Sequence, residues 1–113
     1  MIEAACHCGA VRMEIAAAPD QVTQCHCSIC RKLGVLWAYY PRDQVRIIAA
    51  PDATLAYLRG ERNIAFHSCK TCGCTTHWSA VDPARKRMAV NARLMEPQVL
   101  AAAAVREIQG PEG

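Results

Sequence analysis

Eight cysteines in a chain of 113 residues are the side chains best suited to chemistry. They fall in three groups in which neighbouring cysteines are separated by one or two residues: Cys6-His7-Cys8, Cys25-His26-Cys27-Ser28-Ile29-Cys30 and Cys69-Lys70-Thr71-Cys72-Gly73-Cys74. Such spacings bring sulfur atoms to one point on a tight turn, and Zn²⁺ is held by four tetrahedral sulfur or nitrogen ligands. Glycine follows Cys8 and Cys72, which permits a positive φ and exposes backbone N–H groups to the thiolates. The pattern therefore indicates metal binding.

The first and third groups together offer four thiols for one closed zinc site, which we predict to consist of Cys6, Cys8, Cys69 and Cys72. A site with four protein ligands leaves no position for a substrate, so its role is structural. It ties the start of the chain to a distant segment, and the free energy of metal binding then becomes free energy of folding. Such a cross-link suits a small chain with few large apolar side chains.

The middle group supplies three thiols, Cys25, Cys27 and Cys30. Three protein ligands and one open position are typical of a catalytic zinc site. Alternatively, Cys74 or a histidine completes a second closed site. Cys74 by itself is more simply interpreted as a small buried residue, as free cysteine often is.

The four histidines are interpreted as satisfied or exposed side chains rather than as metal ligands. His7 and His26 each lie between the two cysteines of a C-x-C motif, where an extended chain points the middle side chain away from its neighbours. His67 and His77 lie in predicted strands.

Length and charge limit the remaining possibilities. We predict a single domain over residues 1–113, with a frayed end at about 110–113. The net charge of +3 is small and dispersed, which argues against nucleic acid as a partner. No stretch resembles a signal peptide or a membrane span, so we expect a cytoplasmic protein without a membrane partner. Thiols stay reduced in that compartment, which argues against disulfides. The oligomeric state is left open.

Apolar residues mostly alternate with polar ones, which is typical of half-buried strands. Short strands separated by turn residues are predicted over residues 10–15, 35–40, 45–49, 54–58, 63–69, 75–79 and 86–93. One short helix is predicted over residues 29–33, capped by Ser28 and stopped by Gly34, and a second from Pro97 through the alanine run. The predicted fold class is mainly β with short helices.

The order of the three cysteine groups resembles the glutathione-dependent formaldehyde-activating enzyme family, also called the GFA/CENP-V family. The resemblance runs from Met1 to about Arg93 and rests on the motifs C-H-C-G, C-H-C-S-I-C-R-K and H-S-C-K-T-C-G-C. It implies an Mss4-like β-tent fold with short helices, stapled by a structural zinc and carrying a second, catalytic zinc. Carried over to this chain, the structural ligands are Cys6, Cys8, Cys69 and Cys72, and the catalytic ligands are Cys25, Cys27 and Cys30.

The resemblance also implies an activity, that of a carbon–sulfur lyase of the S-(hydroxymethyl)glutathione synthase type. Such an enzyme joins glutathione and formaldehyde reversibly, so the expected partner is a small thiol or a thiol–aldehyde adduct. Two other functions remain open. One is a non-catalytic, zinc-stabilised module that binds a protein partner. The other is a thiol redox or metal-buffering protein, which the closeness of Cys74 to Cys72 favours.

Three polar residues are candidates for substrate binding. Arg31, beside Cys30, is a candidate to attract a substrate carboxylate. Asn91 and Arg93 are candidate donors, because residues two apart on a strand share a face. Three aromatic residues either wall a pocket or pack in the core: Trp37, Tyr39 and Tyr40.

Overall fold

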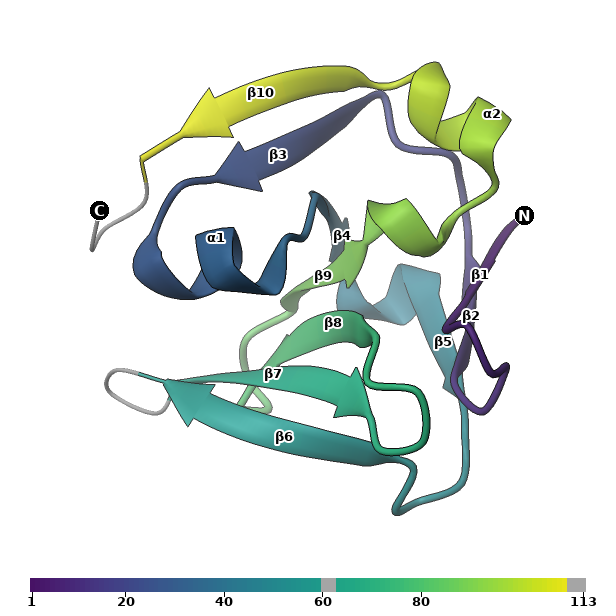
Figure 1. The fold of residues 1–113 in the computed structure, drawn as a ribbon, viewed down its shortest axis with the longest axis vertical. Helices are drawn as coiled ribbons and strands as arrows, with labels where there is room; N and C mark the ends of the chain where they lie inside the picture. Colours follow the sequence, from purple (N-terminus) through teal and green to yellow (C-terminus); the bar gives the residue numbers. More distant parts are fainter. Residues whose placement is uncertain (60–62, 110–113) are drawn as a thin grey trace.

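The computed structural model describes residues 1–59 and 63–109, and within them ten strands form two sheets (Figure 1). The small sheet has the order β1-β2-β5 and contains β1 (Ile2–Ala5), β2 (Arg12–Ile15) and β5 (Val45–Ile48). The large sheet has the order β10-β3-β4-β9-β8-β7-β6. Its strands are β3 (Gln21–Cys25), β4 (Trp37–Pro41), β6 (Thr54–Arg59), β7 (Ile64–Cys69), β8 (Thr75–Ala80), β9 (Arg87–Asn91) and β10 (Ala104–Ile108).

The helical elements of the described residues are short. They are α1 (Ser28–Leu33), α2 (Pro97–Ala101) and two 3₁₀ turns, η1 (Arg42–Gln44) and η2 (Ala92–Leu94). Gly34 ends α1 in the left-handed conformation, with φ 68°, as the sequence predicts. The residue that caps the start of α1 is Cys27 rather than the predicted Ser28, and its sulfur accepts the N–H of Cys30.

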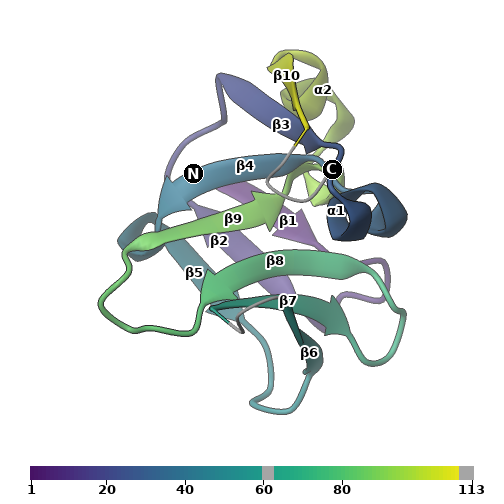
Figure 2. The ribbon, with the colours of Figure 1, turned by 90° about the vertical axis from the view of Figure 1, so that its left-hand side faces the viewer.

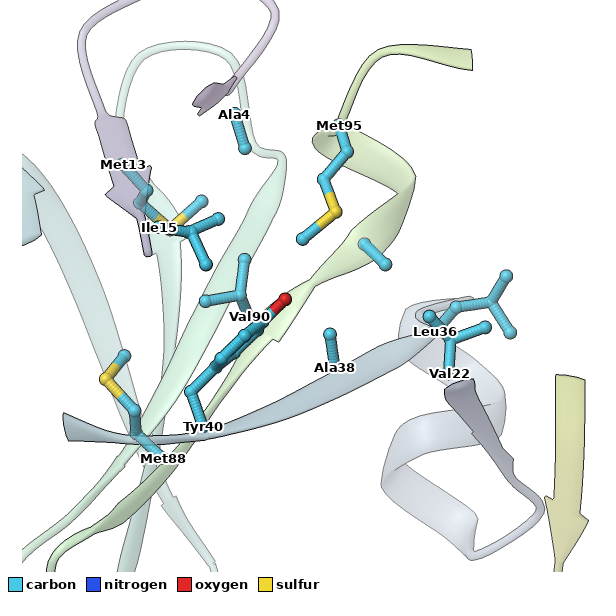
Figure 3. Packing of buried hydrophobic residues seen from close by; sticks show 11 residues of the cluster. Ala4, Met13, Ile15, Val22, Leu36, Ala38, Tyr40, Met88, Val90 and Met95 are labelled. Carbon is cyan, nitrogen blue, oxygen red and sulfur yellow. The ribbon is translucent and has the colours of Figure 1, made fainter. Parts of the chain in front are cut away.

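The main core lies between the two sheets, and Figure 2 shows the small sheet crossing behind β4, β9 and β8. Met13 and Ile15 of β2 are fully buried and point toward Tyr40 and Val90 of the large sheet (Figure 3). Burial of each such side chain contributes about 1.5–3 kcal/mol. The Tyr40 hydroxyl donates to the carbonyl of Ala17 at 2.9 Å, so its polar end is satisfied.

The opposite face of the large sheet carries a row of aromatic rings and receives α1. Register pairs place four residues side by side across β4, β9, β8 and β7: Tyr39, Ala89, Trp78 and Phe66. Because Ala89 has only a methyl group, the rings of Tyr39 and Trp78 approach edge-on with centroids 6.3 Å apart. The ring centroids of Phe66 and Trp37 lie 6.1 Å apart.

The predicted mainly β fold with short helices is confirmed. Each of the seven predicted strands corresponds to an observed one, with differences only at the ends, where boundaries are least well defined. Alternation of apolar and polar residues identifies a strand that is buried on one face, as in β2, where Met13 is buried and Arg12 exposed.

Three observed strands lie outside the predicted ones: β1, β3 and β10. For β10, the reason lies in the alanine run before it. The helix predicted from Pro97 through the alanine run ends at Ala101, and β10 already begins at Ala104. The prediction that the helix spans the whole alanine run is therefore wrong. Alanine favours helix locally, but β10 pairs in parallel with β3 over its whole length, and this non-local pairing outweighs the preference.

No helix among the described residues is long and apolar enough to cross a membrane. The fraying predicted at about 110–113 lies outside the residues that the structure describes.

Candidate metal centres

The turn after β1, the last residue of β7 and the turn that follows β7 bring four sulfur atoms together, which we call the four-cysteine cluster: Cys6, Cys8, Cys69 and Cys72. All four Sγ atoms lie within 4.8 Å of one another. The Cys6–Cys8 and Cys8–Cys69 sulfur distances are 3.7 and 3.6 Å. Four sulfurs held tetrahedrally at about 2.3 Å from one zinc ion lie about 3.8 Å apart, so the observed spacing fits a metal ion. It does not fit a disulfide, whose sulfurs lie about 2.05 Å apart.

Each half of the four-cysteine cluster is a tight turn closed by backbone hydrogen bonds. The Gly9 N–H donates to the Cys6 carbonyl at 3.1 Å, and the Gly73 N–H donates to the Cys69 carbonyl at 2.9 Å. Both glycines have a positive φ, 82° and 83°, which residues with a side chain rarely adopt. The Val11 N–H donates to the Cys6 sulfur at 3.3 Å, and such donors stabilise a thiolate.

The electrostatics of the cluster favour a cation. Backbone N–H groups of Cys74 and Cys8 lower the pKa of the Cys72 thiol to about 5, so this thiol is ionised at neutral pH. Although the Ala10 N–H favours its thiolate, desolvation and the neighbouring sulfurs raise the pKa of Cys8 to about 12. Contacts among the sulfurs add to both shifts, because sulfurs this close cannot all ionise without a positive charge among them.

The end of β3 and the start of α1 form a second group, which we call the three-cysteine cluster: Cys25, Cys27 and Cys30. Its Sγ atoms also lie within 4.8 Å of one another, and all three residues are buried. Burial raises the pKa of the Cys27 thiol, but the Cys30 N–H, the neighbouring thiols of Cys30 and Cys25 and the Ile29 N–H together outweigh this, and the net shift is downward. Among the described residues, no histidine or carboxylate joins the group, so this part of the chain offers three ligands.

Trp37 has a contact with the three-cysteine cluster that sequence reasoning missed. Its indole N–H donates to the Cys30 sulfur at 3.2 Å, and the residue is 1% exposed. Burial raises the pKa of the Cys30 thiol to about 12, and this hydrogen bond opposes the rise. A signal was present, because a buried indole N–H needs an acceptor and cysteines stand shortly before Trp37 in the chain.

The substitution Trp37→Phe is expected to weaken metal binding at the three-cysteine cluster by about 10–100-fold, the usual cost of losing a hydrogen bond to a metal ligand. The phenyl ring keeps an aromatic side chain at this buried position but removes the indole N–H together with part of the ring volume, so the control must remove a similar volume. Competition with a chelator measures the affinity of each site. Trp78→Phe is the matched control, since it removes an indole from the same face without a bond to sulfur. Equal metal affinity in the two variants would contradict the role of the Trp37 hydrogen bond.

The three-cysteine cluster lies between two hollows of opposite character. The first, which we call the apolar cavity, has a volume of about 170 Å³ and is walled mainly by Trp37, Tyr39, Phe66, Trp78 and three isoleucines. The second, the arginine hollow, has a volume of about 90 Å³ and is lined by Gln24, His26, Arg31 and Arg93, among others. Cys25 and Cys30 line both. A ligand at the cluster therefore meets an apolar surface on one side and two cations on the other.

The sequence profile of the glutathione-dependent formaldehyde-activating enzymes matches residues 1–108, which includes both clusters. The chain belongs to this family. The solved structure of a Rhodobacter sphaeroides protein from a structural genomics programme is similar to it, with a TM-score of 0.74 and 26% sequence identity. That similarity covers 93% of this chain and 100% of the other.

In this member of the glutathione-dependent formaldehyde-activating enzyme family, two of the three predicted substrate residues come together. Arg31 and Arg93 are exposed and line the arginine hollow. Asn91 does not join them, because its side chain accepts from the Leu36 N–H at 3.4 Å and donates to the Thr75 carbonyl at 2.8 Å. The expected sharing of a strand face does not apply, since β9 ends at Asn91 and Arg93 lies in η2.

Other predicted candidates lie outside the three-cysteine cluster. Cys74 is half-buried and packs against the four-cysteine cluster, so it is not in position to complete the other one. Tyr40 packs in the main core, whereas Trp37 and Tyr39 wall the apolar cavity.

Within the described residues, none of the four histidines belongs to either cysteine cluster. His7 is exposed, and His26 Nε2 lies 2.9 Å from a carboxylate oxygen of Glu107. The rings of His67 and His77 are stacked, with centroids 4.3 Å apart. Burial lowers the pKa of both, that of His77 to about 3, so this pair is neutral at physiological pH.

Proposed function

We propose that this protein is a zinc-dependent carbon–sulfur lyase that joins a thiol and an aldehyde reversibly, with glutathione and formaldehyde as the reactants that the family name indicates. The observation that carries the proposal is the position of three buried thiols between an apolar cavity and an arginine-lined hollow. A cytoplasmic location accords with this function, because both clusters need reduced thiols.

The donor sets fit two zinc ions, since both consist only of thiols. The four-cysteine cluster would hold a structural zinc, and the three-cysteine cluster would hold a catalytic one. Zinc held by three thiolates supplies one open position that favours a soft thiol ligand and lowers the pKa of that thiol.

The residues of the chain bind and orient the reactants. Arg31 and Arg93 would pair with glutathione carboxylates, and the Trp37 N–H stabilises charge on Cys30. In the reaction, the thiol sulfur forms a bond to the carbonyl carbon, the carbonyl π electrons move to oxygen, and the thiol proton ends on that oxygen. The reverse step breaks the C–S bond and releases thiol and aldehyde.

The test is the exchange of ¹³C-formaldehyde with its glutathione adduct, followed by NMR with and without the zinc-loaded protein. We expect faster exchange with the protein, and no acceleration with the Cys25→Ser variant. Identical exchange rates with and without the wild-type protein would rule out this reaction. The result would favour a non-catalytic zinc-binding module.

Substitution of Arg31 or Arg93 by alanine is expected to raise the KM for glutathione by about 10-fold each, with little change in kcat. The estimate takes the low end of a charge-assisted hydrogen bond, because both side chains are exposed. Steady-state exchange kinetics give the two constants. Lys32→Ala is the matched control, since Lys32 is an exposed cation next to Arg31 and does not line the arginine hollow. An equal rise in KM for Lys32→Ala would indicate a general effect of charge.

A further inference from the structure

We propose that the aldehyde partner carries a compact apolar group, up to the size of a benzene ring, and that this group occupies the apolar cavity. The inference rests on the proposed lyase function and adds the class of aldehyde to it. An aryl aldehyde such as benzaldehyde is the type of reactant that these walls fit.

The walls of the cavity are apolar and come from distant parts of the chain. The strands contribute Trp37 and Tyr39 from β4, Phe66 from β7 and Trp78 from β8. Isoleucines from α1, β7 and β10 complete the lining: Ile29, Ile64 and Ile108. The indole N–H of Trp37 is already bonded to the Cys30 sulfur, which leaves this ring only its apolar surface to offer.

The size of the apolar cavity indicates how large the substituent of the aldehyde is. The cavity has a volume of about 170 Å³ and is partly open to solvent, and an enclosed apolar cavity of about 150 Å³ is large enough to take up benzene. The hydroxymethyl group of a formaldehyde adduct has no apolar substituent, so it would leave these aromatic walls facing water. A phenyl group would cover them, and burial of its apolar area would stabilise the complex.

The position of the cavity gives the orientation of the adduct. Cys25 and Cys30 line both hollows, so a sulfur bound at the cluster sits where the two meet. The carboxylates of the thiol partner then lie toward Arg31 and Arg93, and the substituent of the aldehyde lies toward Phe66 and Trp78. The covalent step is unchanged. The thiol adds across the C=O bond, forming one C–S bond and one O–H bond, and needs no oxidant or reductant.

The binding experiment uses two stable thioethers, S-benzylglutathione and S-methylglutathione, titrated into zinc-loaded protein by calorimetry. They differ only in the group that would enter the cavity. We expect S-benzylglutathione to bind at least ~10-fold more tightly, from the burial of one phenyl ring. Equal binding of the two, or binding of neither, would overturn the inference, and this comparison needs no variant.

A pair of variants locates the binding site of the phenyl group. Ile108→Trp fills the cavity from β10 and is expected to abolish the preference for the benzyl compound. Val105→Trp is the matched control on the same strand, where Val105 is 55% exposed, and it should retain the preference. Loss of the preference in both variants, or in neither, would mean that the phenyl group binds elsewhere.

An exchange assay with benzaldehyde and formaldehyde separates this inference from the proposed function. Accelerated exchange of both aldehydes together with the benzyl preference supports both proposals. Acceleration with formaldehyde and no benzyl preference overturns the substrate class and leaves the lyase function standing. A benzyl preference without acceleration of either exchange overturns the lyase function, and with it the identification of the bound group as part of a substrate.

Discussion

Replacement of Cys6 by serine is expected to unfold the domain. Cys6 is buried and belongs to the four-cysteine cluster, in which Cys8 and Cys69 alone are 61 positions apart in the chain. A structural zinc contributes about 10–16 kcal/mol of apparent binding free energy in small domains, and a domain has a net stability of only about 5–15 kcal/mol. Loss of one thiolate ligand therefore removes a large part of the free energy of unfolding.

The packing around the four-cysteine cluster supports this expectation. The buried residues there are only Cys6, Val11 and Cys69, so this end of the described structure has little apolar core of its own. Circular dichroism and thermal unfolding measure the effect, and zinc content by mass spectrometry shows how many ions remain. Cys74→Ser is the matched control, because Cys74 packs beside the cluster without belonging to it. It should unfold close to the wild-type temperature with unchanged zinc content.

Replacement of Cys25 by serine is expected to leave the domain folded, lower the zinc content from two ions to one and abolish catalysed exchange. The three cysteines of this cluster lie in one short stretch, so a metal ion there closes only a short loop and constrains the unfolded chain little. The cluster also rests on an apolar face in which Trp37, Phe66 and Trp78 are buried. Folding there is supported by apolar burial without the metal.

Zinc content and exchange kinetics test the Cys25→Ser variant, with His26→Ala as its control. His26 stands between Cys25 and Cys27 but is paired with Glu107 and is not part of the cluster. His26→Ala should keep both ions. If it loses one, the second site has a histidine ligand. If Cys25→Ser is more destabilising than Cys6→Ser, the structural and catalytic roles of the two clusters are reversed.

The helix α1 shows which structural features can be predicted from neighbouring residues alone. Gly34 ends it as predicted, because a left-handed residue after a short amphipathic turn is a local requirement. Cys27 replaces Ser28 as its cap because the cysteine spacing that suits a metal also places a sulfur before the Cys30 N–H. The sequence predicts that Asn91 faces substrate, yet its amide accepts from the Leu36 N–H and donates to the Thr75 carbonyl, both from other segments of the chain.

The sequence by itself determined seven of the ten described strands and the local cysteine groups, because alternation and ligand spacing are properties of neighbouring residues. The pairing of the first cysteine group with the third followed from the need for four ligands and not from local spacing. Only the tertiary structure decided what surrounds the three-cysteine cluster. The Trp37 hydrogen bond, the aromatic wall and the joining of Arg31 with Arg93 depend on strand pairings across the large sheet. These pairings join residues far apart in the chain, and no local pattern specifies which strands become neighbours. The surroundings of the three-cysteine cluster therefore depend on the order of the strands in the large sheet.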